Sequence, residues 1–260
     1  MADSINKTNN PDSPYYGYEE WKGWTEDKVL PEVPNSTSQD YFTREFERAK
    51  VLPGSKILEI GFGNGEFLRW AEFNGYDVSG IEINEKLYHL GKKRGFQVFL
   101  GTMTDDPKEL GGGFDAVVAF DVLEHLPKEL LLDYFKAINS RLKVEGRVIV
   151  RFPNGQSPFG TYAQHGDITH QTALTGRLLD QVTSKAGFSM EGCYNTVRIH
   201  GKKKDQKYLK IFPPRPSRTI LNTALFRRTR SMGRKPYLRS GQKIDLSRRK
   251  PGFKSLLRHS

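Results

Sequence analysis

The stretch ILEIGFGNG, residues 57–65, is the most informative part of this sequence. A short apolar run carries Glu59 and is followed by three glycines at alternate positions, Gly61, Gly63 and Gly65. Glycine permits positive φ and a close approach of the backbone to a ligand, because it has no Cβ atom. The stretch therefore predicts a strand, a tight turn and a helix, with a ligand outside the carboxyl end of the strand.

The spacing of the following residues narrows the kind of ligand. The third glycine comes one residue earlier than in the dinucleotide fingerprint GxGxxG. Glu82 follows Gly65 by 17 residues, in the segment GIEIN that ends the next predicted strand, and Asn84 in that segment is predicted to cap the following helix. A carboxylate at this position can accept hydrogen bonds from both hydroxyls of a ribose and repels a 2′-phosphate. The alternative interpretation of Glu82 is a solvated charge at the end of a strand.

Strand and helix patterns alternate outward from this stretch. Strand patterns occur at 56–60, 76–83, 96–100, 114–120, 146–152 and 188–199, with helix patterns between them. The run FDAVVAF at 114–120 is apolar throughout, which indicates a central strand buried on both faces. We therefore predict an α/β fold, Rossmann-like and doubly wound, with a mostly parallel sheet and helices on both faces.

Composition divides the chain into three parts. Residues 1–35 are polar and rich in Asn, Ser and Pro, and we expect a flexible segment there. Residues 36–200 are predicted to form the domain, which begins with a helix over 38–52 capped by Ser38. Residues 201–260 form a basic C-terminal extension.

Charge and cysteine content restrict the partners. The net charge is +11, but the residues from His200 onward hold 19 Lys or Arg against 2 acidic residues, a net of +17. The preceding residues hold the other 22 basic and 28 acidic residues, a net of −6. Any contact with a polyanion is therefore expected at the tail. Cys193 is the only cysteine, and no signal or membrane-spanning pattern is present, so we expect a cytoplasmic protein.

The combination of ILEIGFGNG, Glu82 and FDAVVAFDVLEHLP at 114–127 resembles the motifs of class I S-adenosylmethionine-dependent methyltransferases. It is most similar to the small-molecule subgroup related to ubiquinone-biosynthesis O-methyltransferases, over about residues 38–199. The resemblance implies a seven-stranded sheet and S-adenosylmethionine as the methyl donor. In that family the seventh strand lies antiparallel between strands five and six, and the segment GQKIDLS, residues 241–247, is a candidate for it.

The resemblance also implies a set of donor-binding residues. Glu59 should orient the glycine loop or reach the donor's amino group, and Glu82 should bind the ribose. Met103 should lie near the adenine, although Thr102 stands where the subgroup often has an Asp. The remaining contacts, to the methionine part, are implied for Gly61, Gly63, Gly65, Asp121 and Val122.

The loop RFPNGQSPFGTYAQHGDITH, residues 151–170, carries groups suited to the methyl acceptor. A histidine can remove the proton of an alcohol near neutral pH. We predict His165 as this base, with Asp167 orienting it and with His125 as a second candidate. Alternatively His170 and Thr175 cap or anchor the next helix. Candidate substrate contacts are Arg151, Asn154, Gln164 and His170; a metal would need a particular loop geometry, and none is predicted.

The motifs FPNGQSPFG and QHGDITH in this loop resemble a subgroup from bacterial O-antigen and capsule gene sets. This implies a sugar or sugar-phosphate hydroxyl as acceptor, on a nucleotide sugar or a lipid-linked glycan. One alternative is an RNA or protein methyltransferase whose basic tail holds the substrate, although no NPPY-type tetrapeptide is present. A non-catalytic protein that only binds S-adenosylmethionine is the second alternative.

The tail segment SRTILNTALFRRTRSM, residues 217–232, has the spacing of an amphipathic helix. Its apolar side would hold Ile220, Leu221, Ala224 and Leu225, with arginines around them. A basic amphipathic helix suits the anionic inner surface of a membrane. The alternatives are packing of the helix on the core, a solvated extension, and a contact with RNA, which we expect less.

Overall fold

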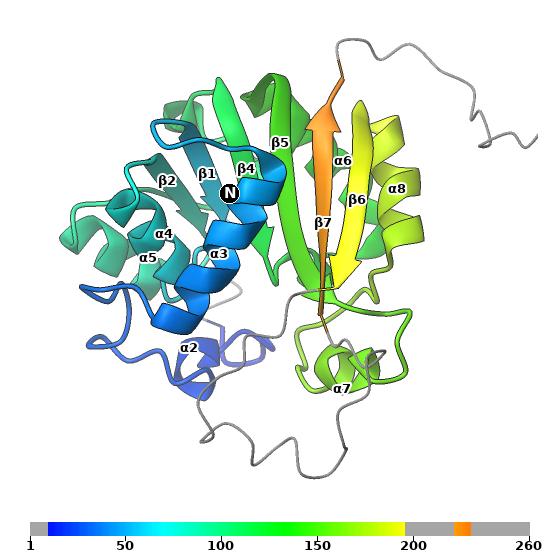
Figure 1. The fold of residues 1–260 in the computed structure, drawn as a ribbon. Coiled ribbons are helices and arrows are strands. Elements are labelled where there is room, and N and C mark those ends of the chain that lie inside the picture. The colour runs from blue at the N-terminus through cyan, green and yellow to red at the C-terminus, as the bar shows by residue number, and fades with distance from the viewer. Residues whose placement is uncertain (1–9, 196–220, 230–260) are drawn as a thin grey trace, which may run out of the picture.

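A seven-stranded sheet runs through the molecule in the order β3-β2-β1-β4-β5-β7-β6 (Figure 1). The computed structural model describes residues 10–195 and 221–229. The strands are β1 (Lys56–Ile60), β2 (Asp77–Glu82), β3 (Gln97–Leu100), β4 (Phe114–Phe120), β5 (Leu142–Pro153), β6 (Phe188–Asn195) and β7 (Leu221–Arg228). Strands β1 to β5 pair in parallel, and β7 lies antiparallel to both β5 and β6. The predicted fold class is confirmed.

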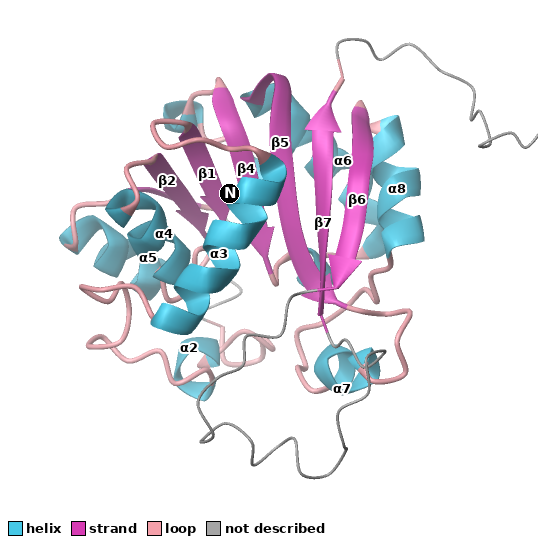
Figure 2. Cartoon of the chain, viewed as in Figure 1, coloured by secondary structure: helices cyan, strands magenta, loops and turns pink. Residues whose placement is uncertain are grey.

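Helices cover both faces of the sheet (Figure 2). Helices α3 (Ser36–Ala49), α4 (Glu66–Phe73) and α5 (Glu85–Lys93) pack on one face, and α6 (Leu131–Arg141) and α8 (Gly176–Lys185) on the other. The shorter elements are α2 (Tyr18–Trp21), η1 (Met103–Asp105), η2 (Lys108–Leu110), η3 (Leu123–His125), η4 (Lys128–Leu130) and α7 (Gly160–His165). Among the described residues, no helix is long and apolar enough to cross a lipid bilayer.

The helix ends follow ordinary capping chemistry. The Asn84 side chain accepts a hydrogen bond from the Leu87 amide at 3.1 Å and caps α5. Helix α3 begins two residues earlier than predicted, because the Asn35 side chain, rather than Ser38, accepts from a first-turn amide. It ends at Ala49, where Lys50 adopts a left-handed φ of 56°.

The seventh strand corrects the expectation for the tail. Residues 221–228 form β7 between β5 and β6, so the predicted amphipathic helix is wrong. Ala224 and Phe226 pack with α6 and α8, whereas Leu225 packs with α3 and α4. A strand buried on both faces has no alternation of polar and apolar residues, so its pattern can mimic a helix.

The seventh strand comes from the basic C-terminal extension. The extension, residues 201–260, was expected to hold the last strand of the sheet, and residues 221–228 within it form β7. A buried hydrogen bond of 3.0 Å between Tyr41 of α3 and Thr223 of β7 joins two elements that are 182 residues apart in the sequence. Ile220 and the candidate strand at 241–247 lie outside the described residues.

The N-terminal segment is folded from residue 10 onward, contrary to the expected flexibility. Val29 and Leu30 are buried, and the Leu30 amide donates to the Asn64 carbonyl at 2.7 Å. The Arg69 side chain donates to the Pro31 carbonyl at 2.8 Å. The average composition of residues 1–35 conceals these few apolar residues, which pack directly on the glycine loop; residues 1–9 lie outside the described part.

Candidate active site

A cavity of about 700 Å³ lies at the carboxyl ends of the central strands. Helix α2 lies at the same edge of the sheet (Figure 1). It is lined by the glycine loop, the end of β2, the turn at 101–105, the end of β4 and part of the N-terminal segment. In open α/β sheets this edge is where ligands bind. The sheet therefore brings the predicted donor residues to one place.

The glycine loop needs its glycines for conformation and for space. Gly61, Gly63 and Gly65 have positive φ of 64°, 53° and 72°. A Cβ atom on Gly63 would lie 2.9 Å from the Trp24 ring, and one on Gly65 would lie 2.2 Å from the Leu30 side chain. The N-terminal segment thus covers the loop so closely that only glycine fits beneath it.

Glu82 holds the glycine loop to the second strand. Its Oε2 accepts from the Gly63 amide at 2.9 Å, and its Oε1 accepts from the amides of Ile83 and Asn84 at 2.8 and 2.9 Å. The side chain is buried but lines the cavity. A carboxylate has about four acceptor positions, so one remains free on Oε2. Glu82 can accept one ribose hydroxyl in this geometry, rather than the two that were expected.

Glu59 provides a buried acceptor beneath the same loop. Its side chain lines the cavity, and within the described part of the chain its Oε2 has no hydrogen-bond partner. Burial, together with the charge of Glu82, raises the pKa of the Glu59 carboxyl well above its usual range. An unpartnered buried oxygen costs free energy unless a ligand satisfies it. The ammonium group of S-adenosylmethionine fits this requirement, and the remaining acceptor of Glu82 fits its ribose.

The expected adenine contact needs a correction. The Met103 side chain is 2% exposed and belongs to the core, not to the cavity lining. Thr102, Thr104 and Asp105 of the same turn line the cavity instead. Asp105 Oδ2 accepts from the amide and the hydroxyl of Thr102, both at 2.8 Å, which shapes the turn. Its sequence signal is the Thr-x-x-Asp spacing.

The end of β4 is held by an ion pair at the cavity wall. Arg151 donates to Asp121 Oδ2 from Nε at 2.9 Å and from Nη2 at 2.5 Å. Asp121 has an unusual φ of 57° and lines the cavity with Val122 and Arg151. Arg151 was expected to bind substrate, but its guanidinium is already paired, so its main role here is to hold Asp121.

His125 is the histidine that faces the cavity. Its Nδ1 lies 2.8 Å from Thr169 Oγ1, and that hydroxyl donates to Asp167 Oδ1 at 2.5 Å. Because the hydroxyl proton points to Asp167, Nδ1 must carry the proton of the ring, and Nε2 keeps its lone pair. Burial, and secondly the charge of His170, lowers the pKa of His125 to about 4. The ring is therefore neutral near pH 7.

His165 does not occupy the place predicted for it. It is exposed at the end of α7 and is absent from the cavity lining. Asp167 orients His125 through Thr169, not His165. The expected base is thus wrong in position, because a loop that leaves β5 turns away before it returns at residue 167. His125, the second candidate, takes this place.

Two other candidates from the loop at 151–170, His170 and Gln164, lie near His125 but outside the cavity lining. His170 Nδ1 lies 3.0 Å from the Gln164 carbonyl, and its ring centroid is 4.6 Å from that of His125. Neither His170 nor Gln164 lines the cavity. The expected helix anchor is supplied by Thr175, whose hydroxyl accepts from the Leu178 amide at 3.1 Å and caps α8.

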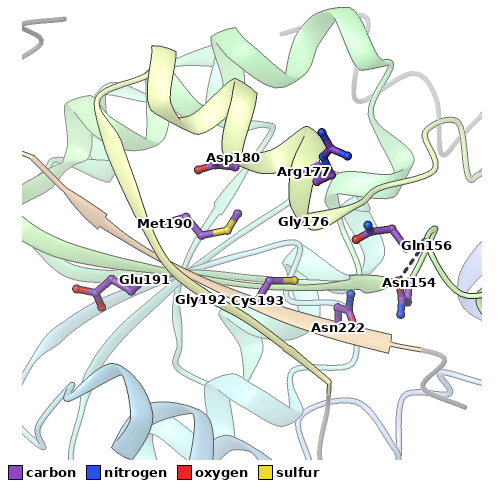
Figure 3. A pocket seen from close by; sticks show the side chains of 10 residues that line it. All are labelled: Asn154, Gln156, Gly176, Arg177, Asp180, Met190, Glu191, Gly192, Cys193 and Asn222. Atoms are coloured by element: carbon purple, nitrogen blue, oxygen red, sulfur yellow. Dashed lines mark hydrogen bonds between the residues drawn. The ribbon is translucent and has the colours of Figure 1, made fainter. Parts of the chain in front are cut away.

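Asn154 belongs to a different hollow (Figure 3). That cavity, of about 660 Å³, lies beside α8, β6 and β7, and the Asn154 side chain accepts there from the Gln156 amide at 3.1 Å. It shares no lining residue with the donor cavity. The predicted substrate contact of Asn154 is therefore not supported by its position.

The lining residues that precede α3 were missed by reasoning from the sequence: Tyr15, Tyr18, Lys22 and Trp24. Tyr18 donates to Asp167 Oδ2 at 2.9 Å, and its ring contacts those of His125 and Trp24. Lys22 Nζ lies 3.3 Å from Asp167 Oδ2. The available signal was the run YYGYEEWKGW at 15–24, in which five of ten residues are aromatic.

Comparison with known proteins gives a family and relatives. The family described as "Methyltransferase domain" matches residues 32–191. The mitochondrial ubiquinone biosynthesis O-methyltransferase of Schizosaccharomyces pombe is 26% identical over 137 residues, which cover 50% of this chain and 49% of that protein. The chain spans about half or less of the length of the first curated relatives that it matches.

Solved structures show the same fold. A SAM-dependent methyltransferase from Archaeoglobus fulgidus has a TM-score of 0.59 at 17% identity, covering 82% of this chain and 99% of that chain. Magnesium protoporphyrin IX methyltransferase from Synechocystis PCC 6803, solved with bound SAH, has a TM-score of 0.56 at 18% identity, covering 82% and 94%. At these identities, the likenesses show the fold.

Proposed function

The chain belongs to the methyltransferase family and uses S-adenosylmethionine, and from this premise we propose that it methylates a hydroxyl oxygen of a small polar acceptor. One observation carries the proposal. The cavity that holds the donor residues also reaches His125, whose Nε2 is free and whose Nδ1 is held by Thr169 and Asp167. This arrangement provides a proton acceptor in the same cavity as the glycine loop.

The chemistry requires alignment and removal of one proton. The acceptor oxygen attacks the methyl carbon while the carbon–sulfur bond breaks, and S-adenosylhomocysteine leaves with the electron pair. His125 Nε2 accepts the proton of the hydroxyl. The rings of Tyr18 and Trp24 border the same cavity and exclude water from the reacting atoms.

We further propose a sugar or sugar-phosphate hydroxyl, on a nucleotide sugar or a lipid-linked glycan of surface-polysaccharide assembly, as the acceptor. The resemblance of the loop at 152–170 supports this class. Tyr15, Tyr18 and Trp24 offer aromatic faces for the apolar side of a sugar ring, and Lys22, paired with Asp167 at 3.3 Å but still one third exposed, can also contact a phosphate. Both features are compatible with this acceptor class.

The basic tail supports a proposal about location. Of its basic residues, Arg227 pairs with Glu145 at 2.5 Å and with Glu191 at 3.2 Å, and Arg228 donates to the Leu142 carbonyl. The other 17 basic residues from His200 onward lie outside β7 and give a strong positive charge. We propose that they bind an anionic surface on the cytoplasmic side of a membrane, with RNA as the alternative partner.

A methyl-transfer screen tests the function. The full chain is incubated with methyl-labelled S-adenosylmethionine and with nucleotide sugars, lipid-linked glycans, RNA or protein. Label is expected on a sugar hydroxyl and is expected to fall strongly in His125→Ala. Label on RNA or protein alone would contradict the proposed acceptor, and binding of the donor without transfer to any acceptor would favour the non-catalytic alternative.

A further inference from the structure

Glu124 lacks any partner for its side chain inside the described structure. The residue is fully buried, and neither carboxyl oxygen has a hydrogen-bond partner there. Its backbone carbonyl is well satisfied, since it accepts from the amides of Gln171 and Thr172 at 2.8 and 3.0 Å. The half-buried guanidinium of Arg151 donates to Asp121 instead. A buried carboxyl with both oxygens unpartnered is costly and indicates a missing ligand.

Two histidines lie next to this carboxyl. One ligand atom each from Glu124, His125 and His170 fall within 4.8 Å of one another. The ring centroids of His125 and His170 are 4.6 Å apart at an angle of 76°, so the rings converge edge to face. Two imidazoles and one carboxylate form a donor set typical of divalent transition metals.

The outer hydrogen bonds of both rings are those of metal-binding histidines. His170 Nδ1 lies 3.0 Å from the Gln164 carbonyl, which can only accept, so this nitrogen carries the proton. His125 Nδ1 donates to Thr169, which in turn donates to Asp167. Each ring therefore keeps its lone pair on Nε2, and that of His170 lies 3.8 Å from Asp167 Oδ2, beyond hydrogen-bond distance. Metal-binding histidines usually have the other nitrogen fixed in this way.

We propose that Glu124, His125 and His170 bind a divalent transition-metal ion, with Zn²⁺ as the preferred one. Ligand atoms around tetrahedral zinc at about 2.1 Å are about 3.4 Å apart, so small side-chain rotations close the observed cluster around an ion. Mg²⁺ and Ca²⁺ prefer oxygen ligands and fit this donor set poorly. The site joins η3 to the loop at 167–172.

The position of the ion also bears on catalysis, and this step rests on the proposed function. His125 borders the donor cavity, so an open coordination position on the ion can face the acceptor hydroxyl. A bound cation lowers the pKa of an oxygen that it contacts. With an ion bound, His125 Nε2 would be a ligand and not the proton acceptor; the ion would stabilise the deprotonated acceptor oxygen, and the hydroxyl proton would be released to bulk water before methyl transfer.

Metal titration of the full chain tests the site directly. The protein is treated with a chelator, dialysed and titrated with Zn²⁺ by calorimetry, and a parallel sample with Co²⁺ is followed by visible absorption. Wild type is expected to bind one Zn²⁺ per chain. Glu124→Gln and His170→Ala are each expected to weaken binding at least about tenfold. About tenfold is the smallest usual loss when a residue that only hydrogen-bonds to a metal ligand is replaced, and loss of a ligand itself should cost no less. His89→Ala, at an exposed histidine of α5, is the matched control and should bind as wild type does.

The outcomes separate the site from the proposed function. Absence of saturable Zn²⁺ binding by wild type, or equal affinity in Glu124→Gln, would overturn the metal site and leave a neutral carboxyl. Equal affinity for Mg²⁺ would also contradict the donor set. Circular dichroism checks that His170→Ala folds, and the isosteric Glu124→Gln keeps the test informative if it does not. Donor binding should survive the chelator; retained donor binding and methyl transfer without any Zn²⁺ binding would remove the metal site alone. Zn²⁺ binding without transfer to any hydroxyl would remove the proposed function alone.

Discussion

The donor side and the acceptor side of the cavity are built in different ways. The donor side comes from residues 59–82, and backbone amides make its main hydrogen bonds to Glu82. The acceptor side joins Tyr18 to Asp167, which are 149 residues apart, and connects both to His125 through side chains. The donor side thus depends on backbone geometry that few residues can adopt, whereas the acceptor side depends on individual side-chain groups.

The largest effect on donor binding is expected from a bulky substitution in the glycine loop. Gly63→Val places a branched side chain at a φ of 53°, where even a Cβ atom would meet the Trp24 ring at 2.9 Å. S-adenosylmethionine binding should be lost in calorimetry, with the fold retained by circular dichroism. Gly75→Ala is the control, because Gly75 also has a positive φ, 77°, but has nothing within 4 Å of its Cβ position. Wild-type affinity in the Gly63 variant would contradict the claim that donor binding depends on the backbone of the glycine loop.

On the acceptor side, the two candidate bases can be set against each other. His125→Ala should lower turnover by about 10²–10⁴-fold, because a base near the reacting hydroxyl is removed. His165→Ala should leave turnover near normal, since His165 is exposed and outside the cavity lining. Rates are measured with the acceptor found in the screen. The opposite ranking of the two variants would restore the base predicted from the sequence.

A smaller loss is expected when the link between the loop and β2 is cut. Glu82→Ala removes the acceptor of three backbone amides and the group that we propose binds the ribose. Donor affinity should fall by about 1.5–3 kcal/mol, the range for hydrogen bonds to a charged group. Calorimetry gives the affinity, and urea denaturation reports the accompanying loss of stability. An unchanged dissociation constant would show that Glu82 shapes the loop without contacting the donor.

The smallest effect tests the long-range link. Tyr18→Phe removes the hydrogen bond from Tyr18 to Asp167 but leaves Thr169 and Lys22 as partners of that carboxylate. The free energy of unfolding should fall by about 1 kcal/mol. Tyr162→Phe, at an exposed tyrosine of α7, is the control and should change little. An equal loss of unfolding free energy in both variants would mean that the hydrogen bond from Tyr18 to Asp167 is not its cause.

The same contrast explains what could be predicted from the sequence. Strand β1 was predicted with its observed bounds and Asn84 with its capping role, because glycine spacing and caps are encoded within a few residues. The positions of Glu59 and Glu82 follow from those elements. Local patterns of this kind need no knowledge of distant contacts.

The missed parts depend on distant contacts. Strand β7 is recognisable only between β5 and β6, since its residues are buried on both faces. Tyr18 and Trp24 reach the cavity because Leu30 packs on Gly65. Likewise, the sequence favoured His165 over His125 as the base, and the path of the loop after β5 reverses that order.

The central claim is that one cavity binds the donor through the glycine loop and presents His125 to the acceptor, and that donor binding does not depend on His125. Titration of S-adenosylmethionine into wild type, Gly63→Val and His125→Ala tests this most directly. Wild type and His125→Ala should bind with similar affinity, and Gly63→Val should not bind. Equal binding by Gly63→Val and wild type, or a loss in His125→Ala as complete as that in Gly63→Val, would contradict the claim.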